Sequence, residues 1–249
     1  MQVIINDLLI QYEQTGKGPV LLMLHGWGDN AATFGKLRDQ LKADFTLVML
    51  DLPGFGQSQV PATVWNLDNY AGVVRDFANK LGLRPRAIVA HSNGGSVAIR
   101  GLAQGVLQAD KLVLLASAGI RDRQKLRRLI LKVIAKVGKV ATFWLPAHHK
   151  KSLQKKLYGA AGSDMLVAPQ LQETFKVTVR QDVQADAAKL SLPTLLIYGA
   201  EDIATPPLYG SIYKRLISGS RLEIVADADH FVHQSHPDTV AKHIKEFLA

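Results

Sequence analysis

The sequence predicts an α/β protein in which helices cover both faces of a mostly parallel sheet. Short apolar runs rich in β-branched residues are typical of buried strands, and helical segments alternate with them along most of the chain. Glycine and proline gather where several of these runs end, which is typical of turns. The chain has 249 residues and 47% hydrophobic content, so we expect one large domain with a substantial core.

The order of these segments predicts a core domain and an insertion. After an edge hairpin at 3–11, predicted strands occupy residues 20–24, 46–50, 87–90, 111–116, 194–198 and 221–225. Predicted helices occupy residues 31–41, 69–81, 93–107, 207–217 and 237–247. The alternation stops between residues 119 and 190, where the pattern is helical. We therefore expect a core formed by residues 1–119 and 191–249, with residues 120–190 as a helical cap.

Composition excludes several classes of site. The chain contains no cysteine, so disulfides and thiolate metal sites are absent. The adjacent pair His148 and His149 makes a poor metal site, and we predict neither a metal nor a cofactor. No apolar run is long enough to span a bilayer, and the first residues lack the features of a signal peptide. We expect a soluble, cytoplasmic protein.

The formal net charge of +9 is concentrated in the predicted cap. Twelve of the 30 basic residues lie between Arg121 and Lys156, against one acid, Asp122, and the rest of the chain carries 18 basic and 20 acidic residues. Apolar residues from Leu126 to Trp144 recur at helical spacing opposite lysines and arginines. Such a basic amphipathic helix fits a lid, a docking face for an acidic carrier protein or the phosphates of coenzyme A, or a surface for anionic lipid. Nucleic acid is the weakest option, because no binding module accompanies the charge.

A candidate nucleophile lies at the turn after the strand 87–90. Small residues, Ala90 and Gly94, flank Ser92 at a strand-to-helix junction, which is the pattern of a nucleophile elbow. Such a turn presents the serine hydroxyl at the edge of the sheet. A serine hydroxyl is a poor nucleophile at neutral pH and needs an imidazole to accept its proton, with a carboxylate to orient that imidazole.

Two residues downstream fit these partner roles. Asp202 and His230 each follow a predicted strand, so we expect both at the same carboxyl edge of the sheet as Ser92. Competing acids are Glu201, which we interpret as a solvated loop charge, and Asp122, which fits charge pairing in the cap. The other histidines have simpler interpretations: surface or helix-entry positions for His233 and His236, and hydrogen-bonding support for His25 and His91.

With these residues placed, the sequence resembles the α/β-hydrolase superfamily over essentially its whole length. The resemblance is carried by residues 25–28 (HGWG), residues 51–58 (DLPGFGQS), the elbow at Ser92, residues 199–202 (GAED) with Pro206, and residues 229–231 (DHF). It implies an eight-stranded, mostly parallel sheet with a cap, and the chain order serine, acid, histidine. Resemblance and geometry both indicate the backbone N–H groups of Trp27 and Asn93 as donors to an oxyanion. The Trp27 side chain fits either a wall of the acyl pocket or the core.

These residues predict a serine hydrolase that cleaves a small-molecule carboxylic ester or thioester through an acyl-enzyme. The HGWG loop with a basic cap is similar to that of pimeloyl-[acyl carrier protein] methyl ester esterases, although those enzymes carry a bulky aromatic where His91 precedes the serine. The same superfamily includes a lyase of menaquinone synthesis with a similar triad. The alternatives are therefore a lyase or acyltransferase on the same triad, or a non-catalytic binding protein that docks an acidic partner on its cap.

Overall fold

One sheet organises the protein. The computed structural model describes residues 1–121 and 168–249. Within them, eight strands pair in the order β1-β2-β4-β3-β5-β6-β7-β8. Their bounds are β1 (Gln2–Ile5), β2 (Leu8–Thr15), β3 (Val20–Leu24), β4 (Thr46–Leu50), β5 (Pro85–His91), β6 (Lys111–Leu115), β7 (Thr194–Gly199) and β8 (Arg221–Val225). The β1–β2 and β2–β4 pairs are antiparallel and every other pair is parallel, which confirms the predicted sheet.

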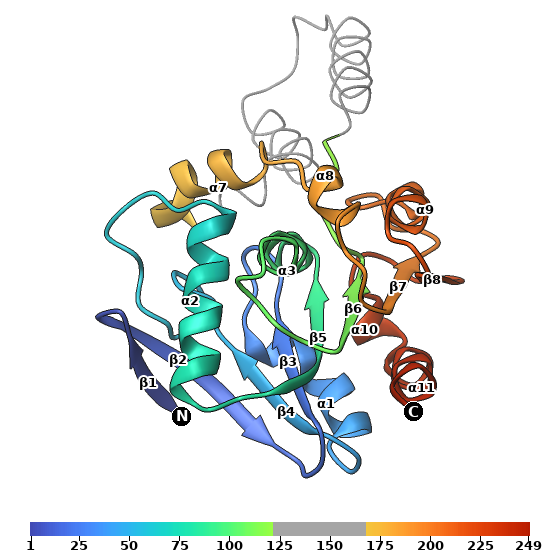
Figure 1. Ribbon diagram of the computed structural model, residues 1–249, viewed down its shortest axis with the longest axis horizontal. Helices are drawn as coiled ribbons and strands as arrows, with labels where there is room; N and C mark the ends of the chain where they lie inside the picture. Colours follow the sequence, from blue (N-terminus) through green and yellow to red (C-terminus); the bar gives the residue numbers. More distant parts are fainter. Residues whose placement is uncertain (122–167) are drawn as a thin grey trace, which may run out of the picture.

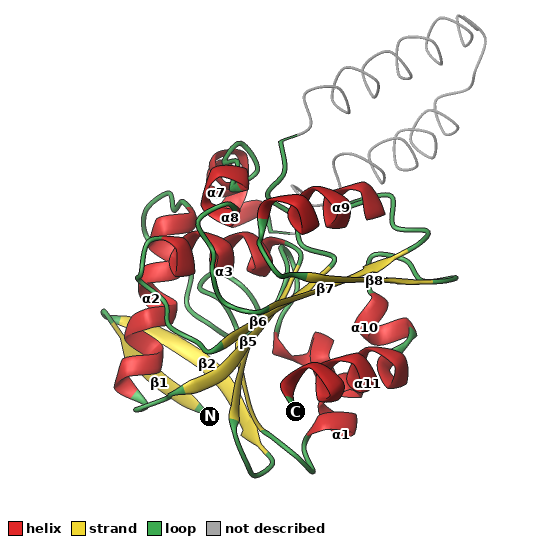
Figure 2. Ribbon diagram, turned by 45° about the vertical axis from the view of Figure 1, so that its right-hand side comes forward, coloured by secondary structure: helices red, strands yellow, loops and turns green. Residues whose placement is uncertain are grey.

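Helices cover both faces of the sheet (Figure 2). One face carries α2 (Leu67–Lys80), α3 (Asn93–Ala103), α8 (Gln184–Ala187) and α9 (Pro207–Leu216). The other carries the 3₁₀ helix η1 (Ala31–Phe34), α1 (Gly35–Leu41), α10 (Val232–Ser235) and α11 (Pro237–Leu248). Each layer closes a separate hydrophobic core against the sheet.

The central strands supply both cores because their side chains alternate. In β3, Leu22 and Leu24 lie in the core beneath α2 and α3, whereas Leu21 and Met23 lie in the core beneath α1 and α11. All four side chains are at most 1% exposed. A strand that is buried on both faces must be apolar throughout, which explains the continuous apolar runs.

The parallel strands β3 to β8 end at one edge, which lies at the top of Figure 1. The loops that leave this edge begin at residues 25, 51, 92, 116, 200 and 226, and the predicted site residues lie at the loops that begin at 25, 92, 200 and 226. Of the predicted cap, residues 168–190 are described and form the 3₁₀ helix η2 (Pro169–Leu171), α7 (Gln172–Thr178) and α8, with α7 and α8 above this edge. Residues 122–167, including the predicted basic amphipathic helix, Asp122 and the pair His148–His149, lie outside the described residues.

Two predicted helices differ in detail from those observed. The segment 31–41 divides into η1 and α1, and the Asn30 side chain accepts a hydrogen bond from the backbone N–H of Ala32 and so caps the start of η1. The helix predicted to reach residue 107 ends at Ala103, since Gly105 at φ 70° turns the chain away.

Candidate active site

Ser92 occupies the sharp turn between β5 and α3. Its backbone lies at φ 50° and ψ −116°, a conformation that residues other than glycine rarely adopt and that marks local strain. The turn requires Gly94, because a Cβ there would stand 2.5 Å from the carbonyl oxygen of Leu24 and 2.6 Å from that of His25. The strained turn and the close approach of α3 to β3 thus present the Ser92 hydroxyl at the carboxyl edge of the sheet.

The structure joins the side chains of Ser92, His230 and Asp202 in one series of hydrogen bonds. His230, in the loop after β8, places Nε2 3.0 Å from Ser92 Oγ and Nδ1 2.8 Å from Asp202 Oδ2. Asp202 follows β7, so the three residues come from the loops after β5, β7 and β8 at the same edge of the sheet. An imidazole with a proton on Nδ1 donates it to the carboxylate and leaves the Nε2 lone pair directed at the serine hydroxyl.

Asp202 is held as a buried carboxylate. The residue is 3% exposed, and its Oδ1 accepts hydrogen bonds from the backbone N–H groups of Ala204 and Thr205, both at 2.8 Å. Its Oδ2 accepts from the Thr205 hydroxyl at 2.7 Å as well as from His230. Burial acts to raise the pKa of Asp202, but the interaction with His230 and the hydrogen bonds from Thr205 outweigh it, so the pKa lies below its ordinary value.

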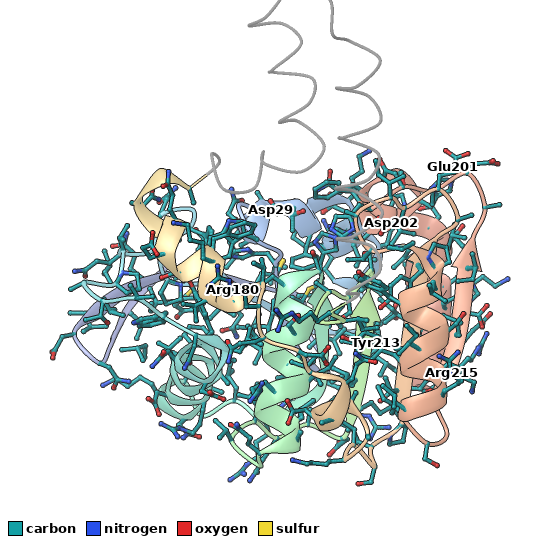
Figure 3. The ribbon with its side chains drawn as sticks, turned by 90° about the horizontal axis from the view of Figure 1, so that it is seen from above. Asp29, Arg180, Glu201, Asp202, Tyr213 and Arg215 are labelled. Atoms are coloured by element: carbon teal, nitrogen blue, oxygen red, sulfur yellow. The ribbon has the colours of Figure 1, made fainter. Side chains whose placement is uncertain are left out.

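The described competitor for the acid role lies apart. Glu201 is exposed and its side chain points to the outside of the molecule, whereas Asp202 lies inward (Figure 3). The two residues are adjacent in sequence, yet only Asp202 contacts His230. The interpretation of Glu201 as a solvated loop charge agrees with this position.

The supporting histidines His25 and His91 are buried. His25 Nδ1 donates to the Gly26 carbonyl at 2.7 Å and its Nε2 accepts from the backbone N–H of Leu52 at 2.8 Å. His91 donates from Nε2 to the carbonyl oxygen of His230 at 3.0 Å, and the two rings lie 4.8 Å apart. Burial lowers the pKa of both His25 and His91. Their predicted hydrogen-bonding role agrees with these contacts.

The expected surface position of His233 is wrong. Its side chain is fully buried, because the short helix α10 places the ring against the rings of Phe34 and His91. Its Nε2 lies 3.1 Å from Thr33 Oγ1. Burial, with a smaller contribution from His230, lowers its pKa to about 3. His236 does stand at a helix entry, as the N-cap residue of α11.

The predicted oxyanion donors line a pocket together with Ser92. Trp27 lies in the loop after β3 and Asn93 is the first residue of α3, where backbone N–H groups have no acceptor within the helix. The pocket has a volume of about 190 Å³. The Trp27 ring also packs edge-on to Phe55, with 4.9 Å between centroids, and against Phe175 of α7 at 5.0 Å. Trp27 therefore lines this pocket and also packs against the core.

Two features of the site have no signal in the sequence patterns. The hydroxyl of Thr205 contacts both Asp202 and His230, and Phe175 and Thr178 of α7 form one wall of the pocket. A threonine before Pro206 and a short helix in the predicted cap do not by themselves indicate such contacts.

In the part of the chain that the structure describes, no group of three or more histidine, aspartate or glutamate residues could hold a metal. No helix there is both long and apolar enough to cross a bilayer.

Comparisons with known proteins agree with this fold. The model of the alpha/beta hydrolase family matches residues 21–243. The pimeloyl-[acyl-carrier protein] methyl ester esterase of Neisseria meningitidis is 28% identical over 241 residues, covering 91% of this chain and 75% of that protein. The uncharacterized hydrolase YugF of Bacillus subtilis is 25% identical over 263 residues, covering 98% and 94%. The crystal structure of a membrane phospholipase A superposes with a TM-score of 0.78 at 25% identity, covering all of this chain and 84% of that one.

The strained serine turn and the sheet topology define the class of an α/β hydrolase. The chain belongs to the alpha/beta hydrolase family. The predictions of this family, of its fold and of an esterase are confirmed.

Proposed function

We propose that this esterase cleaves a carboxylic ester or thioester with Ser92 as nucleophile, His230 as general base and acid, and Asp202 as the residue that orients His230. The observation that carries the proposal is the hydrogen-bond series from Ser92 Oγ through His230 to Asp202, with distances of 3.0 and 2.8 Å. Both distances lie within the range expected for a nucleophile and its base. The buried carboxylate also fixes the tautomer that leaves Nε2 free to accept a proton.

The reaction follows from these positions. Ser92 Oγ attacks the carbonyl carbon while its proton passes to His230 Nε2, and the carbonyl π electrons move to the oxygen. As the tetrahedral intermediate collapses, His230 returns the proton to the departing alcohol or thiol and Ser92 keeps the acyl group. A water then gives a proton to His230 and attacks the acyl carbon. As this second intermediate collapses, the bond between the acyl carbon and Ser92 Oγ breaks, His230 returns the proton to Oγ, and the carboxylic acid leaves.

Charge on the carbonyl oxygen requires hydrogen-bond donors. We assign this role to the backbone N–H groups of Trp27 and Asn93, which belong to residues on the wall of the pocket beside Ser92. Removal of one such donor typically lowers kcat about 10²- to 10³-fold. Because both donors are backbone groups, substitution of either side chain tests packing rather than the hydrogen bond itself.

The proposed substrate is a small acyl ester. The pocket of about 190 Å³ is walled largely by apolar and aromatic side chains: Trp27, Ile120, Phe175, Val179 and Tyr209. Such a lining favours a hydrocarbon acyl or alkyl group over a charged one. The proposed domain layout, with residues 1–119 and 191–249 as core and 120–190 as cap, agrees with the position of α7 above the sheet edge.

A second proposal concerns the partner that delivers the substrate. The basic segment between Arg121 and Lys156 is complementary to an acidic carrier protein, and the relative from Neisseria meningitidis is named for a carrier-bound methyl ester. A carrier-linked ester should react faster than the free ester at low salt, and 0.5 M salt should abolish the difference because it screens the attraction. Equal rates at both salt concentrations exclude the carrier, and a gain on anionic vesicles instead indicates a lipid surface.

The direct test compares wild type with Ser92→Ala. We expect p-nitrophenyl acetate and butyrate turnover to fall at least about 10⁴-fold, and fluorophosphonate labelling to disappear. Most turnover surviving in Ser92→Ala overturns the mechanism. Labelling of wild type without ester turnover indicates a lyase or acyltransferase on the same three residues. Wild type with neither labelling nor turnover indicates a binding protein.

A further inference from the structure

The carboxylate of Asp202 has all of its acceptor positions filled. Oδ1 accepts from the backbone N–H groups of Ala204 and Thr205, and Oδ2 accepts from the Thr205 hydroxyl and from His230 Nδ1. A carboxylate offers about four lone-pair positions, so these four donors saturate it. The Asp202 side chain is fully buried, and its orientation is therefore set by these protein groups.

One of the four donors, the Thr205 hydroxyl, contacts other groups besides Asp202. Thr205 Oγ1 lies 2.7 Å from Asp202 Oδ2, 2.9 Å from the carbonyl oxygen of Ala116 and 3.1 Å from His230 Nδ1. The hydroxyl thus contacts the loops that follow β6, β7 and β8. Thr205 is itself buried, at 5% exposed. A single side chain connects the three loops at the level of the acid–histidine pair.

The geometry points to Thr205 as a positioning residue that holds Asp202 in the rotamer needed to orient His230. This inference rests on the proposed function, because it assigns Thr205 a role in the same reaction. Thr205 acts through Asp202 and His230 and does not itself contact the reacting atoms.

The hydroxyl proton belongs on the Asp202 side in the resting state. A threonine hydroxyl has one proton, while two acceptors, the Ala116 carbonyl and Asp202 Oδ2, lie within reach. An ionised carboxylate is the stronger acceptor, and the 2.7 Å separation is at the short distance typical of O–H···O⁻ bonds. With the proton directed at Asp202, a hydroxyl lone pair remains toward Nδ1–H of His230, which donates mainly to Oδ2.

Loss of the hydroxyl leaves a buried carboxylate oxygen with one donor fewer. The two backbone N–H donors hold Oδ1 but allow the carboxylate to tilt, so Oδ2 is positioned by His230 alone. A displaced Oδ2 orients the imidazole less well toward Ser92, and small displacements of reacting groups lower rates steeply. A purely structural tie of Thr205 to the Ala116 carbonyl would instead affect folding and leave kcat of the folded enzyme unchanged.

Thr205→Val isolates the hydroxyl, because valine has nearly the same shape and keeps the backbone N–H that binds Oδ1. We expect kcat for p-nitrophenyl butyrate to fall about ten- to hundredfold, with KM within about twofold. The rate constant for fluorophosphonate labelling of Ser92 should fall by the same factor, since labelling requires an activated Ser92 but no acyl recognition. Thr205→Ser restores the hydroxyl and should return both rates to within about threefold of wild type.

Thr194→Val is the matched control. Thr194 is a fully buried threonine at the other end of β7, where its hydroxyl donates to the Leu192 carbonyl at 3.0 Å. The Thr194→Val substitution should alter the melting temperature and leave kcat unchanged. If Thr205→Val does not fold, Thr205→Ala removes the same hydroxyl and is held to the same expectation.

The inference is overturned by a folded Thr205→Val enzyme with wild-type kcat, or by Thr205→Ser enzyme as slow as Thr205→Val. Ser92→Ala is measured alongside to separate this failure from that of the mechanism. If the Ser92→Ala enzyme is active, the proposed function is wrong. If Ser92→Ala is inactive and Thr205→Val is unimpaired, the proposed function stands and only the role inferred for Thr205 is wrong.

Discussion

The two ends of the sheet carry hollows that differ in size and in chemistry. The pocket at the carboxyl edge, beside Ser92, has a volume of about 190 Å³. A cavity of about 690 Å³ lies toward the amino ends of β3 and β5, between the end of α2 and the loop before β6. Its polar lining consists mainly of exposed side chains such as Arg75, Arg84 and Gln108.

The smaller hollow carries the features expected of a reaction site. Ser92 and Ala116 both have positive φ at the carboxyl edge, and Asp202 is buried there in a complete set of hydrogen bonds. At the larger cavity the ion pairs are exposed, as between Arg86 and Asp110 at 3.3 Å, and such pairs add little stability. The proposed active site is therefore not at the larger of these two hollows. We assign the proposed site by the strained backbone at Ser92 and by the buried, hydrogen-bonded carboxylate of Asp202.

The largest effect should come from the acid at the smaller hollow. Asp202→Asn replaces one carboxylate oxygen with an amide NH2 group. Where this group faces His230, its N–H needs an unprotonated Nδ1 as acceptor and so favours the wrong imidazole tautomer. We expect kcat for p-nitrophenyl butyrate to fall about 10⁴-fold while the fold is retained. Steady-state kinetics with circular dichroism measures both.

Glu201→Gln is the matched control, because it makes the same change in the neighbouring, exposed carboxylate. It should alter kcat by less than about twofold. An equal loss in both variants, or full activity in Asp202→Asn, would remove Asp202 from the proposed triad.

A second prediction uses the buried histidines behind the site. His233 has a pKa of about 3 in the folded protein, lowered mainly by burial, against an ordinary value of 6.5. Between these values the unfolded chain binds the proton that the folded chain excludes, so the free energy of unfolding falls as pH decreases from 6.5 toward 3. From pH 7 to pH 5 this residue alone should remove about 2 kcal/mol. His91, whose pKa is lowered well below 6.5 by burial, acts in the same direction.

Urea unfolding of His233→Gln at pH 7 and pH 5 measures this contribution. The variant should lose about 2 kcal/mol less than wild type between the two pH values. Thr33→Val removes the hydroxyl next to His233 Nε2 but keeps the titrating ring, and should retain the wild-type pH dependence. A His233→Gln protein with an unchanged pH dependence would show that His233 does not govern acid stability.

The fold and the three candidate catalytic residues could be predicted because each leaves a local pattern. Strands buried on both faces give continuous apolar runs, and Ser92, Asp202 and His230 each directly follow such a run or its turn. The burial of His233 could not be predicted, since its neighbours Gln234, Ser235 and His236 give the segment the composition of a surface loop. The role inferred for Thr205 depends on contacts with loops after three different strands, and no local pattern records them.

The smallest effect tests the comparison of the two hollows directly, with the same substitution in each. Ala118 lines the pocket beside Ser92, and Ala109 lines the larger cavity at the opposite end of the sheet. Ala118→Leu adds three carbons where the acyl group should lie, so kcat/KM for a hexanoyl ester should fall about tenfold, with a smaller loss for an acetyl ester. Ala109→Leu should leave both esters within about twofold of wild type. If Ala109→Leu instead lowers turnover as much as Ala118→Leu, the larger cavity takes part in substrate binding or controls the smaller pocket. The conclusion that only the smaller pocket takes part in the reaction would then be wrong.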